Sequence, residues 1–169
     1  MPLTVVSTIA RQSLGVAYSP VFEEAIHSKK DRYWDELEGT WRAANQMMWY
    51  LKKGEDVIKA QLVSHNFYYS YDSDDEDEFE ETITGVILQC DDDIPPSKRT
   101  GNVKELCKIR INREDTTFES LEEYVAENGR TLKKWDFDLK MIPSGASTEF
   151  VFSHKGEILA SGKADVDFK

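Results

Sequence analysis

The segment SHNFYYSY, residues 64–71, contains the residues best suited to acid–base chemistry. The period of a strand places His65 on one face with Phe67, Tyr69 and Tyr71. A histidine side chain titrates near neutral pH, so His65 could act as a general acid or base while tyrosine hydroxyls orient a ligand. Alternating aromatic residues also pack strands together, and a structural role in the core is therefore the competing interpretation of His65.

If this face lines a cleft or a barrel, His65, Tyr69 and Tyr71 are the candidate catalytic residues of a cofactor-independent isomerase or cyclase. The same face could instead bind a small apolar ligand without catalysis. The candidate ligand-binding residues are the histidine, the two tyrosines and three tryptophans: Trp41, Trp49, His65, Tyr69, Tyr71 and Trp135.

Motifs for other chemistry are missing from the sequence. There is no nucleophile motif and no glycine-rich phosphate loop. The three histidines are scattered and neither cysteine has a ligand at zinc-site spacing, so no cofactor and no metal site are expected. Cys90 and Cys107 do not form a disulfide framework, and two reduced thiols in an intracellular protein are expected instead.

The run DSDDEDEFEE, residues 72–81, concentrates negative charge. Its eight carboxylates and the three of Asp91–Asp93 together account for the net charge of −11, and the rest of the chain is balanced. Carboxylates at this density cannot be buried, and they attract basic surfaces while repelling nucleic-acid phosphates. The sequence therefore predicts a basic protein partner and no direct nucleic-acid binding. The candidate partner-binding residues are Asp72, Asp74, Asp75, Glu76, Asp77, Glu78, Glu80 and Glu81.

Two segments carry helix signals. Ser19-Pro20 resembles an N-cap followed by a first-turn proline, and apolar residues then recur at helical spacing, which predicts a helix at about 20–37. Thr116 and Glu119 form a capping-box pattern, and Asn128-Gly129 is a helix stop signal, which predicts a helix at about 117–128.

Strand signals dominate elsewhere. Apolar and polar residues alternate from residue 59 onward, Lys53-Gly54 and Lys155-Gly156 have the composition of hairpin turns, and the acidic run separates two strand-like segments. The predicted fold is α+β and β-rich, with a curved antiparallel sheet or a partial or closed β-barrel and two helices. It forms one domain over residues 1–169, with a mobile acidic hairpin loop at about 72–81 and a second loop at about 91–102.

The stretch ELEGTWR contains Gly39, Thr40 and Trp41 in the order G-x-W. This motif resembles the start of the first barrel strand of lipocalins and related calycins. The resemblance implies an eight-stranded barrel with a small apolar ligand inside. The order of the predicted elements departs from that family, because two or three strands follow the helix predicted at about 117–128.

Two classes of function follow from these observations. The first is a non-enzymatic acidic interaction protein, such as an inhibitor, an immunity-type protein, a nucleic-acid mimic or a chaperone-like protein. The alternative is a calycin-like small-ligand-binding β-barrel or a cofactor-independent isomerase or cyclase. The N-terminal residues lack the basic start of a secretory signal, and no run approaches the roughly 18 apolar residues of a membrane helix. The expected location is therefore intracellular, in the cytoplasm or alternatively in the nucleus, without membrane contact.

Overall fold

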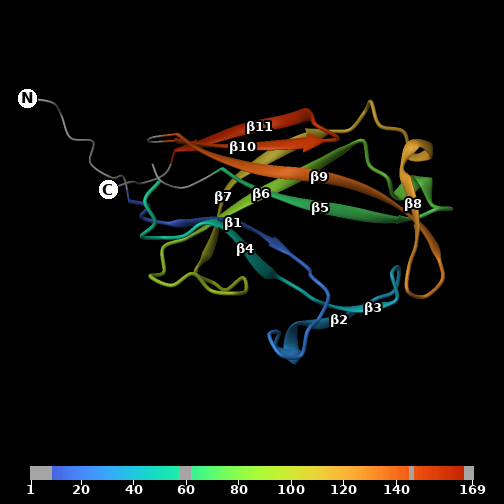
Figure 1. Ribbon diagram of the computed structural model, residues 1–169, viewed down its shortest axis with the longest axis horizontal. Coiled ribbons are helices and arrows are strands. Elements are labelled where there is room, and N and C mark those ends of the chain that lie inside the picture. Colours follow the sequence, from blue (N-terminus) through green and yellow to red (C-terminus); the bar gives the residue numbers. More distant parts are fainter. Residues whose placement is uncertain (1–8, 58–61, 145–146, 166–169) are drawn as a thin grey trace, which may run out of the picture.

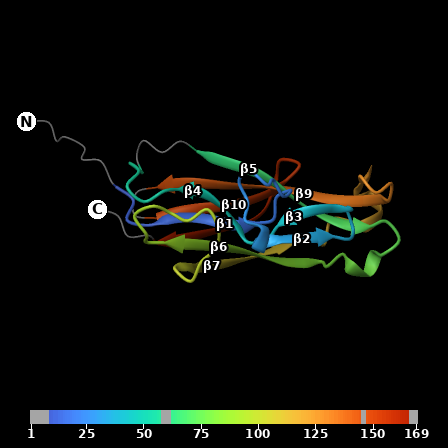
Figure 2. The same cartoon turned by 90° about the horizontal axis from the view of Figure 1, so that it is seen from below.

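The computed structural model describes residues 9–57, 62–144 and 147–165. Within these ranges the protein is built from antiparallel strands in two packed sheets and one small hairpin (Figures 1 and 2). The first sheet has the order β4 (Gln46–Leu51), β1 (Ser13–Tyr18), β6 (Thr82–Cys90) and β7 (Val103–Asn112). The second sheet has the order β11 (Glu157–Asp165), β10 (Ser147–His154), β9 (Thr131–Ser144) and β5 (Val63–Asp72), and β8 (Glu122–Val125) also pairs with β9. The hairpin consists of β2 (Arg32–Asp35) and β3 (Thr40–Ala43).

The two sheets bury their facing side chains in one shared apolar core. This core includes Leu14 and Ile87 from the first sheet and Trp135, Met141 and Phe150 from the second. Burial alternates along β9 from Trp135 to Met141, the pattern expected for a strand with one inner face. The β-rich, antiparallel part of the sequence prediction is therefore confirmed.

Two glycines allow the sheets to approach closely. A Cβ atom on Gly85 of β6 would lie 2.5 Å from the ring of Phe152 on β10. A Cβ atom on Gly162 of β11 would lie 2.9 Å from the side chain of Ile109 on β7. A side chain at either position would therefore have to displace a packed neighbour.

Neither predicted helix is present. Among the described residues the only helical segments are three short 3-10 turns, η1 (Lys29–Asp31), η2 (Glu76–Glu78) and η3 (Phe118–Ser120). In the segment 20–37, Ile26 is 69% exposed and Tyr33 is 39% exposed, so the residues at helical spacing have no apolar surface to cover. Strand pairing of β2 with β3 replaces the helix.

The segment 117–128 forms a strand because of its partner. β8 pairs with the start of β9, which places Glu122 opposite Lys134 and Glu123 opposite Lys133. Asn128-Gly129 turns this hairpin, with Gly129 at a φ of +83° and the Ala126 amide bonded to the Arg130 carbonyl at 2.9 Å. An Asn-Gly pair serves hairpin turns as well as helix ends, so the local signal did not distinguish the two structures.

Of the alternatives predicted, a curved antiparallel sheet or a partial or closed barrel, the closed barrel is wrong, because both sheets have open edges among the described residues. Strand β3 begins at Thr40, and Trp41 lies 44% exposed on the small hairpin, so the barrel implied by the G-x-W resemblance is wrong for this chain. The acidic run connects β5 of one sheet to β6 of the other. It is therefore a crossover between the sheets and not a hairpin between paired strands.

The predicted turn at Lys155-Gly156 is confirmed. Both residues have positive φ, at 49° and 82°, and they join β10 to its partner β11. In contrast, the strands before and after Lys53-Gly54 lie in different sheets. In the part of the chain that the structure describes, no helix has the length and apolar content to cross a membrane.

Candidate functional site

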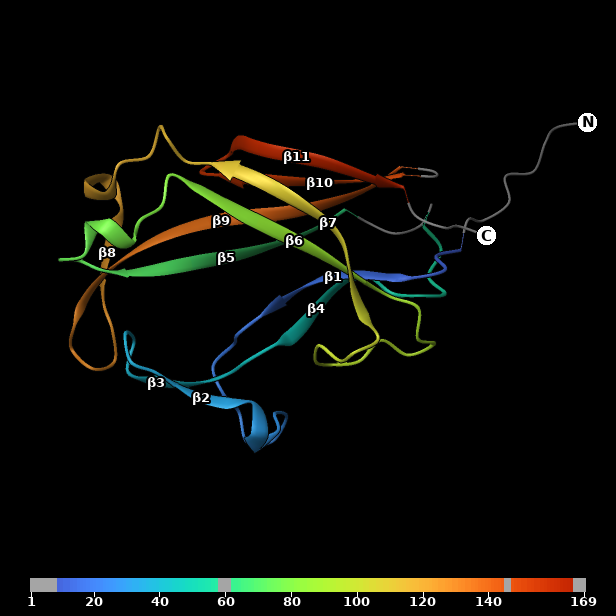
Figure 3. The same cartoon turned by 180° about the vertical axis from the view of Figure 1, so that it is seen from behind.

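The first sheet splits along the boundary between β1 and β6. These strands pair over only three residues each, Ser13–Gly15 with Leu88–Cys90, and then diverge (Figure 3). Both strands are irregular at this point, with register shifts between Leu14 and Gly15 against β4 and between Ile87 and Leu88 against β7. Such bulges bend a strand and increase its twist, so the divergence has a local structural cause.

A cavity of about 680 Å³ occupies the split and extends inward to the second sheet. Its walls come from β1, β6, β5, β9 and β10, and the β2–β3 hairpin closes one side. The wall is largely apolar, and its apolar residues include Val16, Phe67, Val86, Leu88, Phe137, Leu139 and Phe152. Val16 belongs to the core between the sheets, whereas Val86 and Leu88 belong to a cluster on the other face of the first sheet. The cavity therefore passes through the first sheet.

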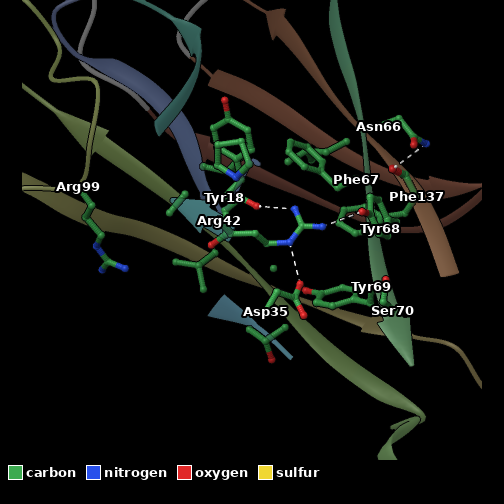
Figure 4. Close-up of a pocket in the computed structure, with 18 of the residues that line it drawn as sticks. Tyr18, Asp35, Arg42, Asn66, Phe67, Tyr68, Tyr69, Ser70, Arg99 and Phe137 are labelled. Carbon is green, nitrogen blue, oxygen red and sulfur yellow. Dashed lines mark hydrogen bonds and ion pairs between the residues drawn. The ribbon is translucent and has the colours of Figure 1, made fainter. Parts of the chain in front are cut away.

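The hairpin contributes a polar wall centred on Arg42 (Figure 4). Its Nε donates to Asp35 Oδ2 at 2.8 Å, its Nη1 donates to the Ser19 carbonyl at 3.1 Å, and its Nη2 donates to the Tyr68 hydroxyl at 3.1 Å. Arg42 also forms an ion pair with Glu38. This one guanidinium therefore joins β3, the turn of the hairpin, the end of β1 and the edge strand β5.

Glu38 is buried, at 8% exposure, and accepts hydrogen bonds from several elements. The Tyr68 hydroxyl donates to it at 3.1 Å, Ser70 donates at 2.8 Å, and Tyr124 of β8 also donates. Burial alone would raise the pKa of Glu38, but these hydrogen bonds and the charge of Arg42 outweigh it and hold the pKa below its usual value. Glu38 is therefore ionised at neutral pH, and burial together with its carboxylate raises the pKa of Tyr124.

Both carboxylates of this wall are bound by internal partners. Besides Arg42, Asp35 accepts the backbone amides of Leu37 at 3.0 Å and Glu38 at 3.1 Å. Every oxygen of Asp35 and Glu38 accepts at least one hydrogen bond from within the protein, so both carboxylates are held in place by internal partners. The network holds the hairpin against the second sheet, and Asn128 adds a hydrogen bond to the Leu37 carbonyl at 3.2 Å.

The chain belongs to the DUF8568 family. The family is described as a domain of unknown function and matches residues 8–155. Every residue that lines the cavity falls within the matched range. No curated protein and no solved structure matches the chain.

The structure brings only one of the predicted catalytic and ligand-binding residues, Tyr69, into the cavity wall. His65 packs edge-on against Tyr50 with ring centroids 4.9 Å apart. Tyr71 is buried and accepts a hydrogen bond from Arg113 Nη1 at 2.9 Å, and the same guanidinium lies 4.8 Å from the ring centroid of the completely buried Trp135. The predicted catalytic set therefore does not converge on one point.

The two remaining tryptophans lie elsewhere. Trp41 stacks edge-on with Trp34 across the hairpin at 5.2 Å and has the Arg32 guanidinium 4.4 Å from its ring centroid. Trp49 donates through Nε1 to the Pro96 carbonyl at 2.8 Å, which holds the 91–102 connection against β4. Neither residue lines the cavity.

Five polar residues of the cavity wall were not among the predicted site residues: Asp35, Glu38, Arg42, Tyr68 and Arg99. Asp35 fell at the end of the helix predicted at about 20–37, and Glu38 and Arg42 lay just beyond it, so the hairpin turn that brings the three together was not anticipated. Tyr68 was placed on the face of β5 opposite His65, but β5 is an edge strand, so side chains of both faces reach the cavity.

The acidic run is held in place through its backbone. Arg113 is only 1% exposed, lies 4.1 Å from the ring centroid of Phe79, and donates through Nε to the Glu80 carbonyl at 3.0 Å. The carboxylates from Asp74 to Glu78 are exposed and form no ion pair among the described residues, whereas Asp72 pairs with Arg130. The structure thus presents these five acidic side chains to solvent.

The described ranges contain neither a metal-binding cluster nor a disulfide. No group of three or more His, Cys, Asp or Glu residues there is arranged to hold a metal ion. Cys90 and Cys107 are free, and burial raises the pKa of both thiols, which keeps them protonated at neutral pH.

Proposed function

We propose that this protein binds a small, mostly apolar ligand in the cavity between β1, β6 and the second sheet. The observation that carries this proposal is the size of the cavity, about 680 Å³, together with its largely apolar wall. Ligand pockets typically measure roughly 300–1,000 Å³. The apolar floor would bind the body of the ligand.

The polar parts of the cavity favour binding over catalysis. Asp35 and Glu38 are engaged with Arg42, and His65 lies outside the wall. Residues 16–18 of β1 pair with β4 and residues 82–87 of β6 pair with β7, but among the described residues neither segment has a strand partner on the side that faces the split. Their main-chain groups supply hydrogen-bonding partners for polar atoms of a ligand. The proposed ligand is therefore amphipathic, with an apolar body.

A cavity-filling substitution tests the proposal. Thr84 lines the cavity from β6 and is exposed, so Thr84→Trp adds bulk without displacing a packed core residue. Ser64→Trp, at an exposed position of β5 outside the cavity wall, is the matched control. N-phenylnaphthylamine, a neutral apolar fluorescent probe, should bind the wild type and the control. It should bind Thr84→Trp at least about tenfold more weakly, because the apolar contacts blocked by the new side chain contribute more than the roughly 1.4 kcal/mol of a tenfold change in affinity.

Equal probe binding by Thr84→Trp and the wild type would show that the probe binds elsewhere and would contradict the proposed function. An absence of binding to the wild type would contradict it as well. Circular dichroism of each variant verifies that the strands remain folded, which aromatic residues at strand positions favour.

A second candidate function is association of the acidic run with a basic protein. The supporting observation is that Arg113 holds the run through a backbone carbonyl, which leaves the carboxylates of Asp74–Glu78 exposed and without ion pairs among the described residues. Complementary charge increases the rate of encounter with a basic partner. A variant in which four of these carboxylates are neutralised should lose salt-sensitive partners in pull-down experiments at low and moderate salt. Its substitutions are Asp74→Asn, Asp75→Asn, Asp77→Asn and Glu78→Gln. Unchanged partners at both salt concentrations would contradict this second candidate.

A further inference from the structure

The ionic groups of the cavity wall are unevenly matched. The wall contains two carboxylates and two guanidinium groups, from Asp35, Glu38, Arg42 and Arg99. Both carboxylates are committed to Arg42, at 2.8 Å from Asp35 and in direct contact with Glu38. The Arg99 side chain has no carboxylate partner among the described residues, and no interaction joins it to the other labelled residues in Figure 4.

Arg99 lies on the connection from β6 to β7, across the cavity from Arg42 (Figure 4). Its backbone amide is fixed by a hydrogen bond to the Asn45 carbonyl at 2.8 Å. Its neighbour Lys98 is paired with Asp31 at 3.4 Å. The backbone at Arg99 is thus anchored, while its five N–H donors remain exposed at the edge of an apolar cavity.

From this imbalance we infer that the ligand is an amphipathic anion whose acidic group is bound by Arg99. The inference rests on the proposed function and specifies its ligand class. An apolar body would lie against Phe67, Phe137 and Phe152, and a carboxylate or sulfonate would lie at the exposed edge, where an anion keeps part of its hydration. Arg is suited to such groups because its planar fork can donate two parallel hydrogen bonds.

The net charge of −11 does not prevent this recognition. The acidic run lies at the opposite end of the sandwich from the 91–102 connection (Figures 1 and 3). At physiological ionic strength charges are screened over about 8 Å, so distant carboxylates contribute little. Within the connection itself, Asp93 is paired with Lys53 at 3.0 Å.

Two related probes separate recognition of the anion from binding in the cavity. Anilinonaphthalene sulfonate carries a negative charge, and N-phenylnaphthylamine is a neutral compound with a similar ring system. Arg99→Gln should weaken the binding of the sulfonate by about tenfold, the usual effect of losing a hydrogen bond to a charged group, and should leave the binding of the neutral probe unchanged. Arg99→Lys should restore part of the affinity for the sulfonate.

Arg110→Gln is the matched control, because Arg110 is exposed on β7 outside the cavity wall and its loss changes the net charge equally. If Arg99→Gln and Arg110→Gln weaken sulfonate binding equally, only general charge matters and the inference is overturned. If the wild type binds the neutral probe but not the sulfonate, the cavity proposal stands and the inference about Arg99 fails. If the wild type binds neither probe, both fail.

Discussion

The buried carboxylate of Glu38 provides the sharpest test of how the hairpin is held over the cavity. Replacing it by glutamine preserves its size but removes its charge. Three neighbours, Tyr68, Ser70 and Tyr124, then donate to a neutral group, and the new amide directs its own N–H donors toward Arg42. We expect Glu38→Gln to destabilise the protein.

The size of the effect follows from these contacts. Removing one partner of a buried ion pair costs about 3–5 kcal/mol, but Arg42 retains Asp35 at 2.8 Å. Hydrogen bonds to a charged group contribute about 1 kcal/mol more than neutral ones, and the glutamine oxygen still accepts some of them. We therefore expect a loss of about 2–4 kcal/mol, or a decrease of about 5–15 °C in melting temperature for a chain of this length.

Glu36→Gln is the control, because the substitution makes the same chemical change at a residue that is exposed in the same turn. It should alter stability by no more than about 0.5 kcal/mol. Urea denaturation measures global stability, and amide hydrogen exchange of β2 and β3 detects local opening of the hairpin. Equal behaviour of the two variants in both measurements would refute the assigned role of Glu38.

The effect of Glu38 should also depend on pH. The pKa of Glu38 is lower in the folded protein than its usual value of 4.5, so the ionised form stabilises the folded state. This contribution is complete above the usual pKa and is lost as the pH falls through the folded pKa. The difference in stability between the wild type and Glu38→Gln should therefore be largest near neutral pH and decrease in acid.

Three further substitutions have defined expectations. Arg113→Met removes the buried donor to the Glu80 carbonyl and should cost about 2–3 kcal/mol in urea denaturation while increasing protease cleavage within the acidic run; resistance equal to that of the wild type would contradict the anchoring role. Gly162→Ala places a methyl group 2.9 Å from Ile109 and should lower stability by about 1–3 kcal/mol, measured by thermal unfolding. His65→Gln should leave binding of N-phenylnaphthylamine unchanged, because His65 lies outside the cavity wall, and a clear loss of probe affinity would place it in the site after all.

The strand pattern was predictable where a strand has one more deeply buried face. The alternation at Val63–Tyr71 matches the burial along β5, and the residues around Lys155-Gly156 form a paired hairpin. These signals are local, since a two-residue turn and a period of two are both contained within a short segment. The β-rich antiparallel fold could therefore be derived from sequence.

The helix predictions failed because the same local signals serve two structures. Within the helix predicted at about 117–128, Phe118 and Leu121 are buried, but they lie in and directly after a 3-10 turn that leads into β8. The segment forms a strand because it pairs with the distant strand β9. In this pairing Glu122 lies opposite Lys134 and Glu123 lies opposite Lys133. Pairing between residues of different segments is not visible in the propensity of either one.

The cavity could not be derived from the sequence, because it arises from a mismatch between strands. A Cβ atom at Gly15 would lie 2.3 Å from the Met48 carbonyl, so this glycine permits the irregular pairing with β4 at the point where β1 turns away from β6. The second register shift, after Ile87, bends β6 at the same level. Each bulge on its own would be a minor adjustment of strand twist. Together they open the first sheet, and the hairpin held by Arg42 and Glu38 then lies over the opening, which leaves the largely apolar cavity between the hairpin and the second sheet.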